Sequence, residues 1–205
     1  MEKPDKRLNI LAAAEKLFSE LGYEGTSTRQ IAKEASANMS MISYYFGSKE
    51  GVFLEIMNKR ISDFTTQLLN ITEDSISPMQ KLFQVIDKYS HRVLDNISFH
   101  KMMHRELSLA QRPEMYCKLK DALAGNLGVL EKIINEGIED QSFRPVDKRM
   151  LIATIMGTVT SVATTPKVTE GTGLDITIAE DREILSKRLI THLEDLVYTY
   201  LTPQK

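Results

Sequence analysis

The segment from Thr26 to Glu50 constrains the fold more than any other part of this sequence. It has the pattern of two short helices joined by the turn Ser36-Ala37-Asn38, with a third helix beginning directly after Gly47. Thr26 or Ser27 can cap the first helix, and the asparagine of the turn can cap the second. Two helices about three residues apart, the second short and amphipathic, are typical of the helix-turn-helix that places a helix in the DNA major groove. A helical hairpin inside an all-α core would show the same periodicity, so the pattern alone leaves both readings open.

Helical periodicity continues to the end of the chain. No strand-like alternation of apolar and polar residues occurs, so the chain is predicted to be all-α. Beyond the opening segment, helices are expected over about residues 5–21, 49–71, 78–96, 98–110, 113–137, 148–163 and 179–201. The 49–71 helix would start at the end of the helix-turn-helix unit and extend far beyond it. We therefore expect two domains, 1–48 and 49–205, joined by one rigid helix.

Net charge gives little support for DNA binding. The 205 residues carry 26 Lys and Arg against 28 Asp and Glu, a formal charge of −2. Residues 1–60 contain nine basic and eight acidic side chains, which leaves 17 and 20 for the remainder. A DNA-binding function must therefore rest on where a few basic groups lie.

Nothing in the sequence points to a membrane or to secretion. No segment approaches the roughly 18 consecutive apolar residues of a membrane span, and the first residues lack the apolar core of a secretory signal. The single cysteine, Cys117, excludes an intrachain disulfide and suits a reducing compartment. We expect a cytoplasmic protein without membrane contact.

The last two expected helices carry wider apolar faces than one subunit's core needs. Small residues recur every four positions in the first of them, at Ala153, Gly157 and Ser161, and would let another helix come close. Paired with their symmetry mates, the two helices would form a four-helix bundle around a two-fold axis. The alternative is that they wrap the subunit's own core. A dimer is favoured because two half-sites about 34 Å apart supply specificity that one short recognition helix lacks.

Specific residues in the first 60 positions resemble a known family. The run TSTRQIAKEA-SAN-MSMISYYFGSKEGVFLEI resembles the DNA-binding segment of the tetracycline-repressor (TetR) family of bacterial transcription regulators, and LAAAEKLFSELGYEG before it resembles that family's first helix. The remainder agrees in general layout. The resemblance implies a helix-turn-helix domain over 1–48 and a helical effector-binding and dimerisation domain over 49–205.

The resemblance also implies which residues contact DNA. Thr28 and Arg29 would contact a phosphate and a base edge, while Tyr45 and Lys49 would contact phosphates. The full set of expected contacts is Ser27, Thr28, Arg29, Met39, Ser40, Met41, Ser43, Tyr44, Tyr45 and Lys49.

Two departures from the family pattern bear on this expectation. Ser36 stands where the turn usually has glycine, so it must adopt a left-handed conformation at some cost or the turn must differ. The recognition helix has no Arg, Lys, Asn or Gln after Asn38, which limits direct base reading. Met39 and Met41 could contact thymine methyl groups, and Arg29 is the best candidate for a guanine.

Met and aromatic residues of the middle helices can fill a core or line a cavity. In a family whose middle domain binds small molecules, some should line a pocket, because thioether side chains adapt to varied apolar ligands. The candidates are Phe83, Ile86, Tyr89, Phe99, Met102, Met103, His104, Tyr116 and Met156.

Metal and enzyme chemistry have weak support. His100 and His104 have the spacing of two metal ligands on one helical face, but no nearby Cys, Asp or third His completes a set. We expect neither a metal nor another cofactor. Nucleotide-binding Gly-rich loops, nucleophile elbows and paired catalytic carboxylates do not occur in the sequence, so an enzyme, including one using Cys117, is not expected.

The sequence therefore predicts a homodimeric transcription regulator, more specifically a repressor of a palindromic double-stranded DNA operator. A small-molecule effector would bind the 49–205 domain and tilt the 49–71 helix, which would change the separation of the recognition helices. The alternative is a helical ligand-binding or protein-interaction dimer that has lost specific DNA binding. The near-neutral first 60 residues and the apolar Met39 and Met41 would suit that alternative.

Overall fold

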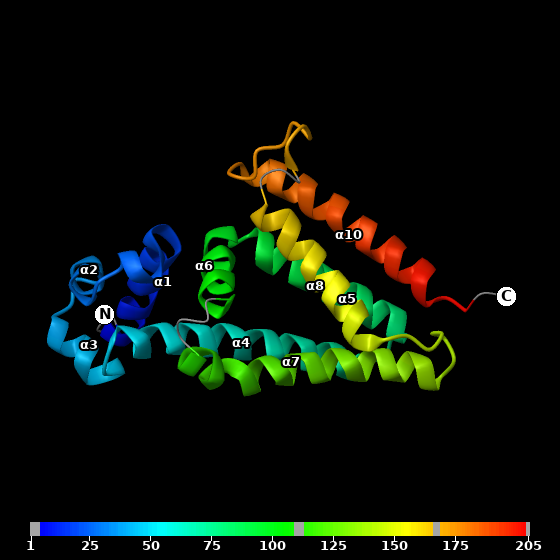
Figure 1. Cartoon of the computed structure of the whole chain (residues 1–205), viewed down its shortest axis with the longest axis horizontal. Coiled ribbons are helices and arrows are strands. Elements are labelled where there is room, and N and C mark those ends of the chain that lie inside the picture. Colours follow the sequence, from blue (N-terminus) through cyan, green and yellow to red (C-terminus); the bar gives the residue numbers. More distant parts are fainter. Residues whose placement is uncertain (1–4, 109–112, 166–168, 204–205) are drawn as a thin grey trace. The chain divides into compact units, whose positions relative to one another are not determined.

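The computed structural model describes residues 5–108, 113–165 and 169–203, and every regular element in these ranges is a helix (Figure 1). The helices are α1 (Lys6–Gly25), α2 (Thr28–Glu34), α3 (Met39–Phe46), α4 (Lys49–Glu73), α5 (Pro78–Leu94), α6 (Ile97–Ser108), α7 (Pro113–Glu139), α8 (Lys148–Thr164) and α10 (Ala179–Leu201). The all-α prediction is confirmed. The predicted end of the 98–110 helix lies outside the described residues. No described helix is long and apolar enough to cross a membrane.

Side-chain caps explain where several helices begin. Ser27 and Ser77 each form a capping box with the glutamine three residues later, and Pro78 occupies the first position of α5. Asp5 and Asp147 accept hydrogen bonds from backbone N–H groups in the first turns of α1 and α8. These caps satisfy donors that a helix start otherwise leaves without partners.

The first helix breaks at its predicted end. The sequence indicates an end at Leu21, and α1 leaves helical geometry at Gly22, where φ is +75°, before a further turn carries it to Gly25. Glycine takes this left-handed conformation without the steric cost of a Cβ atom. A final turn therefore follows the break and leads into α2.

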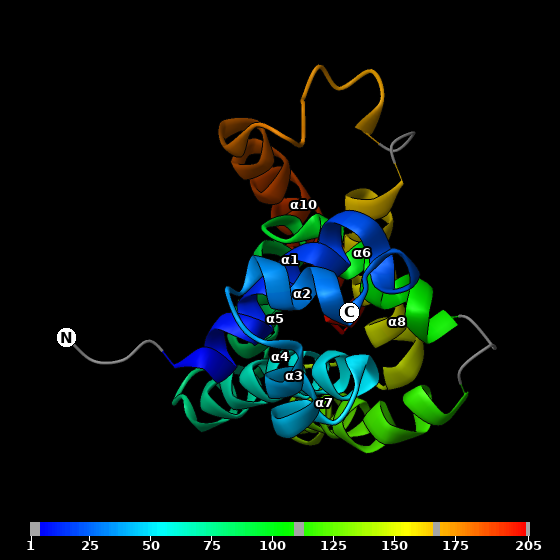
Figure 2. The same ribbon diagram turned by 90° about the vertical axis from the view of Figure 1, so that its left-hand side faces the viewer.

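The first compact unit contains the chain up to Asp63 together with Ser98–Leu123. Its α2 packs against both α1 and α3, and Figure 2 shows the turn between α2 and α3. Three aromatic rings form the centre of its core: Phe18 lies 5.5 Å from Tyr23 and 5.4 Å from Phe53 between ring centroids. Phe99, Met102, Met115 and Leu119 belong to the same core. The helix-turn-helix thus rests on residues from α6 and α7 as well as on its own three-helix core.

The second compact unit contains Phe64–Ile97 and the chain from Ala124 onward. Here α5 packs against both α8 and α10 (Figure 1). A buried lysine, Lys81, donates to Glu136 at 2.9 and 3.0 Å and to the Thr72 carbonyl at 3.2 Å. These partners offset the cost of removing the ammonium from water.

Within this chain, α8 is buried on one side only. Leu151, Ile155 and Val159 face the core, whereas Met150 and the small residues Ala153, Gly157 and Ser161 are exposed. Threonine hydroxyls on α8 donate to carbonyls four residues earlier: Thr154 to Met150, Thr158 to Thr154 and Thr164 to Thr160, at 2.7 to 2.8 Å. The wide apolar face expected for this helix is therefore only partly buried within one chain.

Candidate DNA-binding surface and buried cavity

The helix α3 displays most of its side chains to solvent. Ile42 and Phe46 face the core, with Ile42 1% exposed, while Met39 is 49% and Tyr44 83% exposed. Of the other residues predicted to contact DNA, Ser40, Ser43 and Tyr45 are exposed and Met41 is half-buried against the core. The two buried residues are four positions apart and fix which face of α3 turns outward.

The residues at the start of α2 that were predicted to contact DNA differ in how exposed and how engaged their side chains are. The Ser27 hydroxyl donates to Gln30 Oε1 at 2.7 Å and accepts from the Gln30 backbone at 3.3 Å, so its hydrogen bonds serve the cap. Thr28 is half-buried and Arg29 is exposed. Lys33, which was not among the predicted contacts, is also exposed and lies four residues after Arg29, on the same side of the helix. In the sequence, the spacing of four residues between Arg29 and Lys33 already indicated that the two cations share one side of a helix.

In the turn before α3, the structure has the first of the two alternatives left open by the sequence, a left-handed serine. Ser36 has φ of +48°, and its carbonyl accepts a hydrogen bond from Lys6 Nζ at 3.1 Å. Asn38 then caps α3 by accepting from Ser40 N at 3.1 Å. The turn keeps helix-turn-helix geometry without glycine, at the steric cost of a Cβ atom in the left-handed region.

The ammonium of Lys49 is turned into the first unit. Its Nζ donates to the carbonyls of Tyr23 and Thr26, each at 2.9 Å, and lies 4.2 Å from the Tyr23 ring centroid. Burial lowers the pKa of Lys49, and the charge of Glu106 opposes that shift. Lys49 therefore links the first turn of α4 to the end of α1 and to the connector that follows it. Two of the three N–H donors of this ammonium are therefore used within the first unit, which leaves at most one for a phosphate.

Glu106 brings a buried carboxyl group from α6 to the same region. The residue is 5% exposed, and burial raises the pKa of its carboxyl group above the ordinary value, against the charges of Arg105 and Lys49. The first unit thus holds an acidic group at an electrostatic cost, near the lysine at the start of α4.

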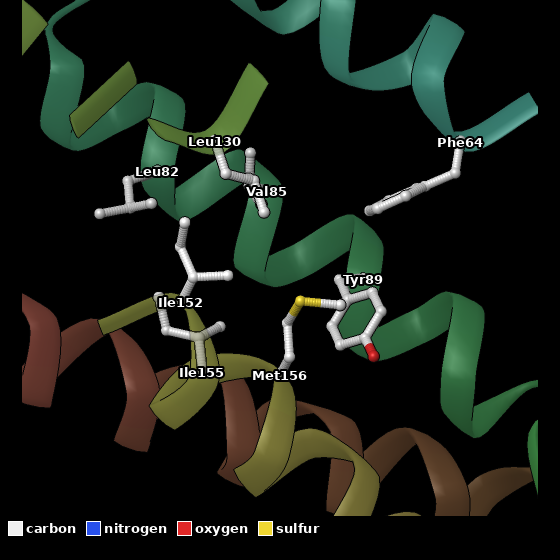
Figure 3. Close-up of a pocket in the computed structure, with 8 residues that line it drawn as sticks. All are labelled: Phe64, Leu82, Val85, Tyr89, Leu130, Ile152, Ile155 and Met156. Carbon is white, nitrogen blue, oxygen red and sulfur yellow. The ribbon is translucent and has the colours of Figure 1, made fainter. Parts of the chain in front are cut away.

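A small cavity lies inside the second unit (Figure 3). It is lined by Phe64 of α4, by Leu82, Val85 and Tyr89 of α5, by Leu130 of α7, and by Ile152, Ile155 and Met156 of α8. Its volume is about 20 Å³, which is room for about one water molecule. A wall of carbon atoms and one thioether favours an apolar ligand group.

The predicted ligand residues do not come together in one place. Tyr89 and Met156 line the cavity, and Phe83 and Ile86 belong to the core around it. In contrast, Phe99, Met102 and Met103 belong to the core of the first unit, and His104 and Tyr116 are exposed. Six lining residues were not selected: Phe64, Leu82, Val85, Leu130, Ile152 and Ile155. Their helical spacing signals burial, but core and cavity residues share that signal.

The two predicted metal-ligand candidates have different environments. His100 is buried and His104 is exposed, although both lie on α6. Among residues 5–108, 113–165 and 169–203, no three His, Cys, Asp or Glu side chains gather in a way that could hold a metal ion. Cys117 is exposed on α7.

Comparisons with known proteins cover almost the whole chain. The family described as "Bacterial regulatory proteins, tetR family" matches residues 10–56, and the one described as "YsiA-like protein, C-terminal region" matches residues 57–186. The fatty acid metabolism regulator protein of Bacillus subtilis (strain 168) is 26% identical over 165 residues, which are 80% of this chain and 84% of that protein. The transcriptional repressor NicS of Pseudomonas putida is 32% identical over 148 residues, 67% of this chain and 66% of NicS.

A solved structure has a closely similar arrangement. The crystal structure of the transcriptional regulator FadR from Bacillus subtilis, in complex with stearoyl-CoA, matches with a TM-score of 0.72 and 25% sequence identity. The match covers 91% of this chain and 96% of that one. The similarity therefore includes both compact units.

Proposed function

This chain belongs to the tetR family of bacterial regulatory proteins and is a DNA-binding transcriptional regulator, and we propose that it is a cytoplasmic, ligand-responsive repressor. The observation that carries the proposal is the orientation of α3. Ile42 and Phe46 anchor the helix, which leaves Met39, Ser43 and Tyr44 on the side away from the core. This arrangement suits a recognition helix in the major groove.

Phosphate contacts would supply most of the affinity, and base reading would come from few residues. Arg29 and Lys33 are exposed cations on α2, and Tyr45 offers a hydroxyl at the end of α3. Lys49 would act chiefly by fixing the connector before α2, because its ammonium already binds two carbonyls. Sequence preference would then depend on Arg29 and on DNA shape.

The exposed faces of α8 and α10 support a homodimer. Met150, Ile184 and Tyr198 are large apolar or aromatic side chains left exposed on these helices. The small residues of α8 would allow a close approach by a second copy. A two-fold bundle of the two helices would bury these side chains and present two recognition helices to a palindromic operator.

The cavity supports a small-molecule effector. Phe64 lines it and belongs to α4, the same continuous helix that begins at Lys49 in the first unit. A ligand that displaces Phe64 would therefore shift α4, and operator and effector would oppose each other by linkage. FadR of Bacillus subtilis was crystallised with stearoyl-CoA. We propose that a ligand with an apolar group occupies the cavity here.

A gel-shift titration of the purified protein on DNA from upstream of its own gene tests the repressor proposal. The wild type should form a saturable complex. Arg29→Ala should lose about 1–3 kcal/mol of discrimination between the operator and mismatched DNA. Lys132→Ala, an exposed cation on α7 in the second unit, is the matched control and should bind like the wild type.

The alternative, a helical ligand-binding dimer that no longer reads DNA, predicts a different result. In that case the protein would be folded and dimeric yet bind all DNA weakly, with the same salt dependence for operator and random sequences.

A further inference from the structure

The first turn of α1 contains two neighbouring cations that contact the two ends of the α3 region. Lys6 donates to the carbonyl of Ser36, in the turn before α3, at 3.1 Å. The guanidinium carbon of Arg7 lies 5.5 Å from the ring centroid of Phe46, the last residue of α3. All four residues belong to the first compact unit. One turn of α1 therefore reaches both the turn before the recognition helix and the end of that helix.

A second contact fixes the direction of the Arg7 side chain. Its Nη2 atom forms an ion pair with Oε1 of Glu55 on α4, and the two side chains are 43% and 30% exposed. The guanidinium group thus lies near a carboxylate of α4 and an aromatic ring of α3. A planar guanidinium suits both neighbours, because it can donate to a carboxylate and also interact with a ring face. Arg7 therefore connects α1, α3 and α4.

Both contacts act on residues that set the orientation of α3. Phe46 and Ile42 are the buried residues of the helix and determine which of its faces turns outward. Ser36 has the left-handed conformation of the turn, with φ of +48°. A cation bound to its carbonyl stabilises this turn, and a cation beside the Phe46 ring stabilises the other end. A small rotation of α3 would move all its exposed side chains relative to the DNA bases.

We propose that Lys6 and Arg7 are positioning residues for operator recognition, which hold α3 in the orientation that reads DNA and do not themselves contact phosphate. The inference rests on the proposed role of α3 as the recognition helix. The alternative for two cations near a DNA-binding surface is a pair of phosphate contacts. That alternative is less favourable for Arg7, because the carboxylate of Glu55 already opposes its charge and weakens its attraction for a phosphate.

The chain contains a matched control for the ion pair of Arg7 and Glu55. Glu15 of α1 forms an ion pair with Arg60 of α4, and their side chains are 29% and 26% exposed. The guanidinium carbon of Arg60 lies 4.5 Å from the ring centroid of Phe99 on α6. The two pairs join the same two helices, but the aromatic neighbour of one belongs to α3 and that of the other to α6. Loss of either pair should loosen α1 from α4, whereas only loss of the first should disturb α3.

Binding of the full-length protein to DNA from upstream of its own gene and to random-sequence DNA, at several salt concentrations, tests the proposal. Arg7→Met should lower the preference for the operator about tenfold, which is comparable with one mismatched base pair. Lys6→Met should lower it about threefold, because its contact is exposed. The affinity for random DNA and its salt dependence should stay at wild-type values. A lost phosphate contact would instead weaken both complexes alike and reduce the slope of log affinity against log salt by about one.

Glu55→Gln distinguishes positioning from a phosphate contact by the sign of its effect. The substitution breaks the ion pair but leaves the cation of Arg7, so a phosphate contact by Arg7 would strengthen and both DNAs would bind more tightly. Positioning predicts instead that the preference for the operator falls, as in Arg7→Met. The double variant should then lose no more preference than Arg7→Met alone, because both substitutions break the same contact. Glu15→Gln, the matched control, should keep the wild-type preference.

Thermal unfolding and the affinity for random DNA report whether the first unit of each variant is folded. A wild-type preference in Arg7→Met, a reduced salt slope in Arg7→Met or Lys6→Met, or an equal loss of preference in Glu15→Gln would overturn the proposal. The repressor proposal would stand in each of these cases. A wild-type protein that binds operator and random DNA alike would overturn the repressor proposal and, with it, the inference about Lys6 and Arg7.

Discussion

The eight residues of α3 and the eight side chains of the cavity are arranged in opposite ways. The helix α3 buries Ile42 and Phe46 and exposes most of its other side chains, so one short segment of sequence contains this part of the surface. The cavity draws on four helices between Phe64 and Met156, and every lining residue faces inward. Which side chains of α3 are exposed depends on local caps and turns, whereas the cavity depends on packing between segments that are distant in the sequence. Matched substitutions in the two units can test this difference.

The largest effects should come from two glycines that approach other atoms closely. A Cβ atom at Gly51 would lie well under 3.0 Å from the Phe46 carbonyl oxygen, and one at Gly137 well under 3.0 Å from the Phe143 ring. Gly51→Ala and Gly137→Ala should each cost about 3 kcal/mol. Urea unfolding measures both costs.

The two glycine variants should differ in function. Gly51→Ala distorts the backbone between α3 and α4, so operator binding should fall far more than ligand binding, and Gly137→Ala should show the reverse. If both variants lose both activities equally, the two units do not respond separately.

The two capping boxes offer a smaller and more closely matched test. Ser27→Ala and Ser77→Ala remove the same cap and should each cost about 1 kcal/mol. Ser27→Ala should also weaken operator binding, because α2 has only seven residues and sets the position of the turn. Thermal unfolding and gel shift measure the two effects.

Ser27→Asp is the control for a direct DNA contact. It retains the cap but places a negative charge near phosphate, so it should keep stability and lose operator affinity. A normal affinity for Ser27→Asp would argue that Ser27 lies away from the DNA.

A still smaller effect is expected at two non-glycine residues that have a positive φ. Ser36 has φ of +48° and Gln141 has φ of +66°. Replacing either by glycine removes a steric cost of roughly 1–2 kcal/mol but adds flexibility to the unfolded chain. We expect a net stabilisation of about 0.5 kcal/mol in each variant, measured by urea unfolding.

Only Ser36→Gly should alter operator binding, through a more flexible turn. A destabilised Ser36→Gly protein would mean that the serine side chain stabilises the turn by more free energy than its left-handed backbone conformation costs.

The smallest effects concern two carboxyl groups, Glu106 in the first unit and Glu194 in the second. Burial raises the pKa of each; the charge of Asp87 adds to the shift of Glu194, whereas Lys49 opposes that of Glu106. A raised pKa means that the folded state favours the protonated form. The resulting stabilisation is present below the ordinary value of 4.5 and is lost as the pH rises through the raised pKa.

Glu106→Gln and Glu194→Gln should therefore gain stability relative to the wild type as the pH rises from about 4 towards neutrality. Unfolding free energies measured across this range test both variants. A stability difference that does not change with pH would show that neither carboxyl group titrates with a raised pKa.

The sequence predicted the first unit better than the cavity for a physical reason. Ser27, Asn38 and Gly47 are local signals, and each acts within a few residues of its position. The left-handed conformation of Ser36, one of two alternatives at that position, also belongs to a local turn. By contrast, the Lys49 ammonium binds carbonyls 23 and 26 residues earlier in the chain. The residue pattern of a single helix cannot predict a contact over this distance in the sequence.

The cavity was harder to predict because core residues and cavity-lining residues have the same apolar pattern in a sequence. Ile86 and Val85 are neighbours on α5, and both are buried, yet only Val85 lines the cavity. A void depends on how side chains from α4, α5, α7 and α8 fit together. Phe99 and Met102 show the same limit, since their apolar spacing was correct for burial but they belong to the other unit's core.

The threonines of α8 have a consequence for assembly. Thr154 and Thr158 donate their hydroxyl hydrogens to carbonyls of their own helix, so their methyl groups are available to a neighbour. If this face were buried against a second copy, few donors without hydrogen-bond partners would lose water. The free-energy cost of dehydration would therefore be small. Dimerisation should accordingly release water mainly from carbon surface, with a negative heat-capacity change and an affinity that weakens on cooling.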